Sequence, residues 1–320
     1  MRKPIAITFA IAFAIAPVLA TAAETVKVVV PRRGSWDSSF TELGMRQGFF
    51  KEQGLDLKIV YTNGDDANEQ AIASGQADIG VASGFLDTLA AYVRGEPVRI
   101  ISPESTGAPD LFWTAKIAGA IASMSDLHGK SVSYSRAGSA SYFILLDLLR
   151  DAGVNDATLM PIANPFAGTV EVIGFQIDAS WSMPPAAIKD LLSGEIRTIG
   201  RGNDSPEVRG QTYRVNVANA NFLAAHRDAV AGFLKAYKKS VDWAYSGDQA
   251  LQAFAALSDQ QMEVVKYTVR GFALKAANQV DIIQGEDRTL QQALAAKRIP
   301  HAMTHDDVKG VYDLVLEHDH

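Results

Sequence analysis

The sequence predicts an α/β fold with two lobes, each a mostly parallel β-sheet flanked by helices, and with a helical C-terminal region. Short apolar runs of strand length alternate with helix-length segments in two successive blocks. Such alternation is typical of parallel strands joined by crossover helices. Turn-rich segments interrupt the alternation at 103–110 and 201–210, and 320 residues suffice for two lobes of ordinary domain size.

The first 22 residues have the composition of a secretory signal peptide. Arg2 and Lys3 precede an apolar run over 5–19, and small residues follow at 20–23. The apolar run is shorter than the roughly 20 residues that a membrane-spanning helix needs. We therefore expect residues 1–22 to be a cleaved signal that exports the protein to the periplasm. The position of the cut stays open among three alanines of this stretch.

Charge and cysteine content exclude several classes of protein. Without Arg2 and Lys3 the chain keeps 28 basic residues (30 − 2) and 36 acidic ones, a formal net charge of −8. A chain this acidic is unsuited to binding nucleic acid. The sequence contains no cysteine, which excludes disulfides, thiolate metal sites, a cysteine nucleophile and a lipid-modified cysteine anchor.

The first lobe begins with an apolar strand over 26–30, followed by a turn-rich loop. A helix is expected over 38–53, because apolar side chains recur at helical spacing and Gly54 follows as a stop. The unit then repeats as strand 55–60, a helix capped by Asp65 or Asp66 and ending at Ser74, strand 78–82, helix 85–94 and strand 98–102.

The second lobe restarts the pattern after residue 110. Its expected elements are strands 111–115, 131–134, 158–162, 177–181 and 196–199, and helices 139–152 and 184–192. A strand returns over 212–217, and helical segments are expected over 221–246, 248–256, 259–272, 286–297 and 305–317. We predict one lobe from 23–105 plus 212–320 and the other from 106–211, joined by two crossing segments that form a hinge.

Candidate ligand-binding residues lie where strands lead into helices. Ligands of open parallel sheets bind beyond the carboxyl ends of the strands, where free helix amides attract anions. Three such segments carry small or hydroxyl residues, and Arg136 is the best-placed cation because a guanidinium grips an acidic group with two donors. The predicted set is Ser35, Trp36, Asp37, Ser83, Gly84, Phe85, Ser135, Arg136, Gly138, Ser139 and Trp181.

Simpler interpretations of these residues stay open. Serine and glycine also serve as ordinary helix caps, the tryptophans can equally pack in a core, and Arg32 and Arg33 can be surface charges. The sequence has no Gly-x-Ser-x-Gly elbow, and Gly129-Lys130-Ser131 lacks the earlier glycine of a phosphate-binding loop. A dispersed triad would leave no such signature. We expect no enzymatic activity, no metal and no cofactor.

Five short motifs, in their order and spacing, resemble the periplasmic binding proteins of the nitrate, sulfonate and taurine importers. They are Gly48–Asp56, Ala73–Gly80, Asp126–Lys130, Asp147–Val154 and Gln176–Ala179. The resemblance implies a type II periplasmic-binding fold, shared with pyrimidine-precursor-binding proteins, and a monomer that serves an ABC permease. It also places ligand contacts in the loops named above. Pyrimidine synthases of this fold use a cysteine-rich segment, which this chain lacks.

These observations together predict a periplasmic solute-binding component of an ABC importer. We expect it to capture a small organic anion, of sulfonate or carboxylate type, in the cleft between the lobes and deliver it to a membrane permease. The Arg32-Arg33 pair, Trp181-Ser-Met and the short 162–177 segment depart from the family pattern, which leaves the ligand open. One alternative is an uncharged heteroaromatic, such as a thiamine-precursor pyrimidine, between Trp36 and Trp181. Another is a periplasmic ligand sensor.

Overall fold

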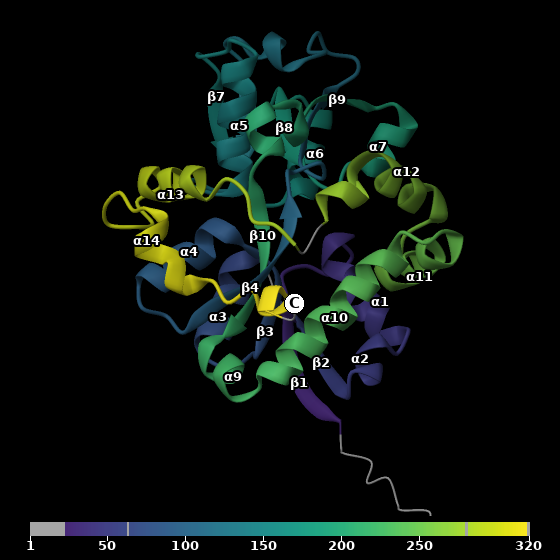
Figure 1. Ribbon diagram of the computed structural model, residues 1–320. Helices are drawn as coiled ribbons and strands as arrows, with labels where there is room; N and C mark the ends of the chain where they lie inside the picture. Colours follow the sequence, from purple (N-terminus) through teal and green to yellow (C-terminus); the bar gives the residue numbers. More distant parts are fainter. Residues whose placement is uncertain (1–22, 63, 279–280, 319–320) are drawn as a thin grey trace, which may run out of the picture.

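The computed structural model describes residues 23–62, 64–278 and 281–318, arranged in two lobes (Figure 1). The predicted signal peptide, residues 1–22, lies outside the described residues. Each lobe contains one five-stranded sheet with helices around it, which is the predicted α/β class. Within the described ranges, no helix is long and apolar enough to span a membrane.

The first sheet has the strand order β2-β1-β3-β10-β4. Its strands are β1 (Glu24–Val30), β2 (Leu55–Tyr61), β3 (Ile79–Gly84), β4 (Val98–Thr106) and β10 (Thr212–Asn219). Strand β1 pairs in parallel with β2 and β3, whereas β10 pairs antiparallel with β3 and β4. Successive side chains of a strand point to opposite faces of the sheet. Val28 packs in one hydrophobic core and Val29 in the other, so both faces of this sheet are apolar.

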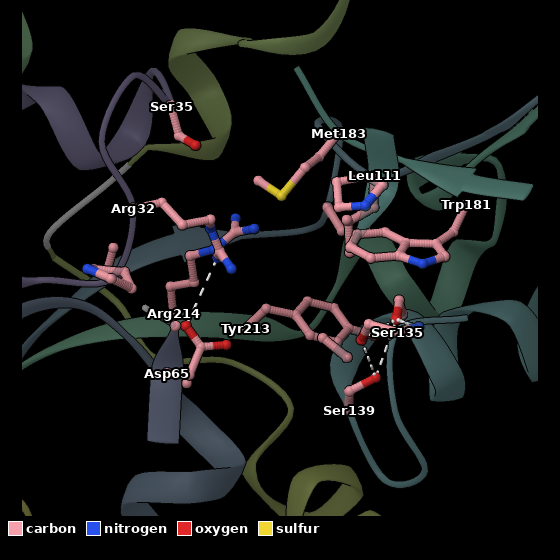
Figure 2. Close-up of a pocket in the computed structure, with 18 of the residues that line it drawn as sticks. Arg32, Ser35, Asp65, Leu111, Ser135, Ser139, Trp181, Met183, Tyr213 and Arg214 are labelled. Carbon is pink, nitrogen blue, oxygen red and sulfur yellow. Dashed lines mark hydrogen bonds and ion pairs between the residues drawn. The ribbon is translucent and has the colours of Figure 1, made fainter. Parts of the chain in front are cut away.

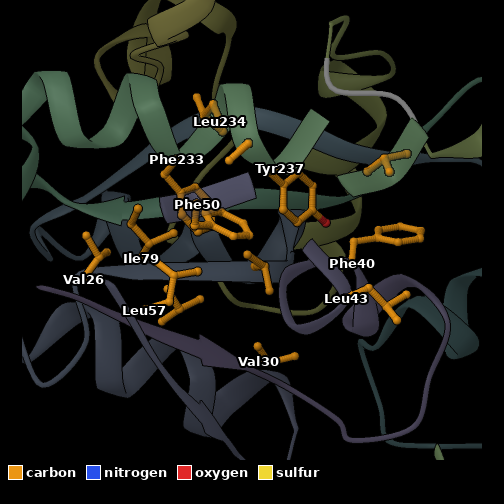
Figure 3. Packing of buried hydrophobic residues seen from close by; sticks show 14 of the residues in the cluster. Val26, Val30, Phe40, Leu43, Phe50, Leu57, Ile79, Phe233, Leu234 and Tyr237 are labelled. Carbon is orange, nitrogen blue, oxygen red and sulfur yellow. The ribbon is translucent and has the colours of Figure 1, made fainter. Parts of the chain in front are cut away.

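Helices cover both faces of this sheet. One face is covered by α1 (Phe40–Arg46), α2 (Phe49–Glu52) and α10 (Arg227–Ala244), the other by α3 (Asp65–Ala73), α4 (Phe85–Val93) and α13 (Glu286–Ala295). Figure 3 shows Phe40, Leu43 and Phe50 packed with Phe233 and Tyr237 of α10. Gly44 lets α1 approach α10 closely, because a Cβ there would lie 1.7 Å from the Ser240 Oγ.

The second sheet has the order β7-β6-β8-β5-β9. Its strands are β5 (Phe112–Lys116), β6 (Ser131–Tyr134), β7 (Thr158–Pro161), β8 (Ala179–Ser182) and β9 (Ile196–Arg201). Its main helices are α5 (Ala140–Asp151), α6 (Pro165–Ile173) and α7 (Ile188–Ser193), with the short α8 (Pro206–Arg209) before the return to the first lobe. The fully buried Trp113 is at the centre of the core that includes α5.

Two connections join the lobes, residues 107–111 from β4 to β5 and 202–211 from β9 to β10. Strands β5 and β10, which directly follow these connections, are the strands that run against the other four of their sheets. Each sheet is therefore mixed, with four strands in one direction. A strand that enters from the other lobe needs no crossover helix, so it is free to run antiparallel.

The C-terminal helices contact both lobes. They are α9 (Ala220–Ala225), α11 (Asp248–Ser258), α12 (Met262–Phe272) and α14 (His305–Val308), besides α10 and α13. Val264 and Phe272 of α12 pack with Phe112 and Ile188 of the second lobe, whereas Leu290 of α13 belongs to the core of the first lobe. Residues 212–320, which we predict as part of the first lobe, thus include a helix that packs against the second lobe.

The structure differs from the expected elements in several places. The helix expected over 221–246 divides at His226 into α9 and α10. The helix expected over 38–53 breaks into α1 and α2 at Gly48, whose φ of 81° lies in the left-handed region. The segment 163–176, where no element was predicted, contains α6, capped by Asn164 with Pro165 in its first turn. The helix expected over 305–317 is reduced to α14 followed by 3₁₀ turns.

Candidate ligand-binding site

A cavity of about 830 Å³ lies between the two lobes, beyond the carboxyl ends of several strands. This volume falls within the roughly 300–1,000 Å³ of typical small-molecule sites. Loops of both lobes and strand β10 form its walls. Figure 2 shows that the cavity separates two groups of residues: Arg32, Ser35 and Asp65 on one side, and Leu111, Trp181 and Met183 on the other.

Three serines at the start of α5, called here the hydroxyl triangle, form one polar part of the cavity wall. The Oγ of Ser135 lies 2.9 Å from that of Ser139 and 2.8 Å from that of Ser141, and the last two are 3.0 Å apart. Ser139 also caps α5, where its Oγ accepts a hydrogen bond from the Tyr142 amide at 3.3 Å. Rotatable hydroxyl donors and the positive end of a helix meet here, so this wall favours a negatively charged group.

An apolar wall lies next to the hydroxyl triangle. It is formed by Leu111, Phe143, Trp181 and Met183. The Trp181 indole N–H donates a hydrogen bond of 2.7 Å to the Ile162 carbonyl, which fixes the orientation of the ring. The cavity therefore combines a polar part with an apolar surface that suits the carbon skeleton of a small organic molecule.

Arg214 of β10 also lines the cavity, but the protein neutralises its charge. Its Nη2 lies 2.7 Å from Asp110 Oδ2, and its Nε lies 3.3 Å from Asp37 Oδ2. Burial opposes the charge, yet the carboxylates of Asp110 and Asp37 outweigh burial and hold the pKa of Arg214 above its ordinary value. This side chain ties β10 to the 107–111 connection through Asp110 and to the segment after β1 through Asp37.

Arg32, Arg33 and Arg136 also line the cavity, and Arg32 and Arg136 are paired to different degrees. An Nη2 of Arg136 lies 3.2 Å from Asp87 and 3.2 Å from Asp66, so two carboxylates share this guanidinium. The ion pair of Arg32 with Asp65 is longer, 3.7 Å, and the Arg32 Nε has no hydrogen-bond partner among the described residues. Arg32 is therefore the more loosely held cation facing the cavity (Figure 2).

Most of the predicted ligand-binding residues line this one cavity. They are Ser35, Gly84, Phe85, Ser135, Arg136, Gly138, Ser139 and Trp181. They lie in the loops after β1 and β6, at the junction of β3 with α4, and near the end of β8, as expected for residues at the carboxyl ends of strands.

The structure places the three other predicted residues away from the cavity. Trp36 packs edge-on against Tyr245 and Phe254, with ring centroids 5.4 and 4.9 Å away, and its indole N–H donates to the Tyr245 hydroxyl at 2.8 Å. Asp37 pairs with Arg214. The Ser83 Oγ accepts a hydrogen bond of 2.9 Å from Asn68. Because Trp36 lies in the core, it does not face Trp181 across a ligand.

Several lining residues were not in the predicted set. Tyr213 and Arg214 lie on β10, and Met183 lies two residues after Trp181. Asn164 and Phe166 come from the start of α6. The Asn164-Pro165 pair is a cap-and-first-turn signature that could have located α6. In the described part of the chain, no group of three or more histidine, aspartate or glutamate side chains is placed to hold a metal ion.

Comparison with known sequences identifies a family. The profile described as NMT1/THI5 like matches residues 42–250, more than half of the chain. The 4-amino-5-hydroxymethyl-2-methylpyrimidine phosphate synthase THI5 of Saccharomyces cerevisiae is 26% identical over 221 residues, which cover 63% of this chain and 61% of the yeast protein. The chain thus spans about three fifths of the length of this curated relative.

Solved structures with the same fold include two sulfonate-binding proteins. The periplasmic aliphatic sulphonate binding protein SsuA of Escherichia coli has a TM-score of 0.74 at 16% identity, over 89% of this chain and 91% of that one. The alkanesulfonate-binding SsuA of Xanthomonas axonopodis pv. citri, bound to MOPS, has a TM-score of 0.71 at 17% identity, over 91% and 99%. The chain therefore belongs to the NMT1/THI5-like family and has the fold of a periplasmic binding protein.

Proposed function

We propose that this protein is the periplasmic solute-binding component of an ABC importer and that it captures a small organic anion between its lobes. One observation carries the proposal: an interlobe cavity of about 830 Å³ in which the hydroxyl triangle adjoins an apolar wall. The protein would act as a monomer and deliver its ligand to permease subunits in the inner membrane. The signal-like residues 1–22 support a periplasmic location.

The hydroxyl triangle receives the acidic group of the ligand. Each serine hydroxyl can turn its proton from its neighbour toward an anion, and the α5 amides add to the attraction. Arg32 on the opposite side supplies a cation whose own partner is 3.7 Å away. The apolar wall of Leu111, Phe143, Trp181 and Met183 then covers the carbon skeleton. A sulfonate or a carboxylate on a small apolar group matches this arrangement.

Binding without turnover is part of the proposal. The yeast relative is named a synthase, so the family includes at least one enzyme. The present sequence contains no cysteine, and the family resemblance associates the pyrimidine synthases with a cysteine-rich segment. The structural neighbours cited above are named as binding proteins. Mass spectrometry of each ligand after incubation with the protein tests this point, and conversion of a bound ligand would overturn it.

Isothermal titration calorimetry with ethanesulfonate, benzoate, nitrate and a hydroxymethylpyrimidine tests the ligand class. We expect an organic anion to bind and Ser139→Ala to weaken it by about tenfold to a hundredfold, since a hydrogen bond to a charged group contributes about 1.5–3 kcal/mol. Ser193→Ala is the matched control, because its hydroxyl bonds the Asp190 carbonyl at the surface, outside the cavity. Binding of no organic anion, or equal losses in both variants, would refute the proposal.

A pyrimidine is the second candidate ligand. The aromatic side chains of Trp181 and Tyr213 both line the cavity, and the yeast relative is named for a pyrimidine. Stacking on an aromatic ring adds about 0.5–1.5 kcal/mol beyond the buried area. If the pyrimidine binds and Trp181→Ala weakens it while Ser139→Ala does not, this candidate replaces the anion.

A further inference from the structure

The loop that carries the hydroxyl triangle is tied to the other lobe by ion pairs. Arg136 lies within this loop, between Ser135 and Ser139, and belongs to the second lobe. Its carboxylate partners, Asp66 and Asp87 at 3.2 Å each, lie on α3 and α4 of the first lobe. These contacts join segments that are neither paired in a sheet nor adjacent in the chain.

We propose that Arg136 and Asp87 form an interlobe latch that stabilises the closed arrangement, meaning the one in which this ion pair joins the lobes, and sets the residence time of the ligand. The inference rests on the proposed function, because it concerns the same cavity. It changes the role expected for Arg136: the guanidinium acts on the opposite lobe, and the charge of the ligand is balanced elsewhere.

The pairing of Asp87 makes such a latch reversible. The side chain of Asp87 is only 10% exposed, so its ionised form needs a cationic partner in every state. Arg298, which follows α13, provides one: its Nη2 lies 2.8 Å from Asp87 Oδ1. Helices α4 and α13 pack in one core of the first lobe, so this second pair can persist when the lobes separate. Opening then exposes Arg136 to water without leaving Asp87 unpaired.

Close packing around the same loop supports the latch. Gly138 has a φ of 74°, and a Cβ added there would lie 2.8 Å from the Cβ of Ala296 at the end of α13. A further ion pair, between Arg288 of α13 and Asp147 of α5, also connects α13 to the second lobe. The start of α5 is thus held against the first lobe by contacts on both sides of the hydroxyl triangle.

A latch and a ligand counter-ion predict opposite results for Asp87→Asn. If Arg136 is a latch, both Arg136→Gln and Asp87→Asn weaken closure and speed the release of ligand. If Arg136 balances the charge of the ligand, Asp87→Asn leaves the guanidinium with Asp66 as its one remaining carboxylate among these two and tightens anion binding. The Asn side chain has nearly the same size and keeps a polar oxygen beside Arg298, so we expect the local fold to persist.

Distances between spin labels test the latch directly. The chain has no cysteine, so Lys58→Cys on β2 and Asn155→Cys, both at exposed positions in different lobes, label it cleanly. Without ligand, we expect Arg136→Gln and Asp87→Asn each to enlarge the long-distance population. Arg94→Gln is the matched control, because Arg94 pairs with Glu69 and Glu96 inside the first lobe.

Stopped-flow dissociation of ethanesulfonate provides the second measurement. We expect about a tenfold faster release from Arg136→Gln and from Asp87→Asn, with association rates nearly constant. Slower release from Asp87→Asn, or label distances that match the wild type in both variants, would overturn the latch. If neither ethanesulfonate nor benzoate binds the wild type, the proposed ligand class fails, and the ligand-free distances still decide whether the latch exists.

Discussion

Buried Glu104 contributes to the pH dependence of the free energy of unfolding, and substitution of this one residue should remove its contribution. The side chain lies on β4, is 1% exposed, and has Asp37, Arg214 and Asp110 around it. Burial, and then the charge of Asp37, raises the pKa of Glu104 to about 8, because Arg214 offsets only part of these effects. Between its ordinary pKa of 4.5 and about 8, the folded chain holds a proton that the unfolded chain has lost.

The sign and the size of the effect follow from this proton. Because the folded state binds it more tightly, the free energy of unfolding falls as the pH rises from 4.5 toward 8, and levels off above. At about 1.4 kcal/mol per pH unit, the full window corresponds to a loss of up to about 5 kcal/mol. The amide of Glu104→Gln does not ionise, so this contribution to the pH dependence disappears in the variant.

Urea denaturation at about pH 5, 7 and 8.5 measures the difference between Glu104→Gln and the wild type. Titrating groups that do not interact with Glu104 cancel in this difference. We expect it to shift in favour of the variant by several kcal/mol between the first and last pH. Glu195→Gln, at an exposed position before β9, serves as the control and should follow the wild type. A difference that stays constant across these pH values would refute a buried, protonated Glu104.

Two substitutions test packing in the first lobe. Trp36→Ala should lower the free energy of unfolding by about 3–5 kcal/mol, because the ring packs on Tyr245 and Phe254. Ligand affinity measured by calorimetry should stay unchanged. Lost affinity at wild-type stability would contradict this placement. Gly44→Ala should lower the melting temperature, because the new Cβ would lie 1.7 Å from the Ser240 Oγ. Adding Ser240→Gly should restore part of that loss, and no recovery would argue against this contact.

The fold was accessible from the sequence because its strands are apolar on both sides. Val28 and Val29 serve different cores, so the first strand reads as a continuous apolar run rather than an alternating one. The antiparallel strands β5 and β10 were not foreseen. Their direction depends on where the chain arrives from the other lobe, and apolar patterning carries no information about that.

The local differences from the prediction depended on the backbone or side-chain conformation of single residues. A helix-length apolar pattern crosses Gly48, yet the backbone turns there into the left-handed region and separates α1 from α2. Trp36 lies in the loop after β1 and Trp181 lies near the end of β8, and of these two only Trp181 faces the cavity. A loop can turn its aromatic side chain outward or back into its own lobe, and that choice depended on Tyr245 and Phe254, more than 200 positions later.

Charge was the hardest property of the site to predict, because ion pairs form between residues far apart in the chain. Arg136 stands among serines, which made it the best candidate for a ligand contact, yet Asp66 and Asp87 from the other lobe share its guanidinium. Arg32, given less weight, has the longer ion pair of 3.7 Å. The anionic character proposed for the ligand therefore depends on the hydroxyl triangle and Arg32, and it is independent of whether Arg136 ever contacts a ligand.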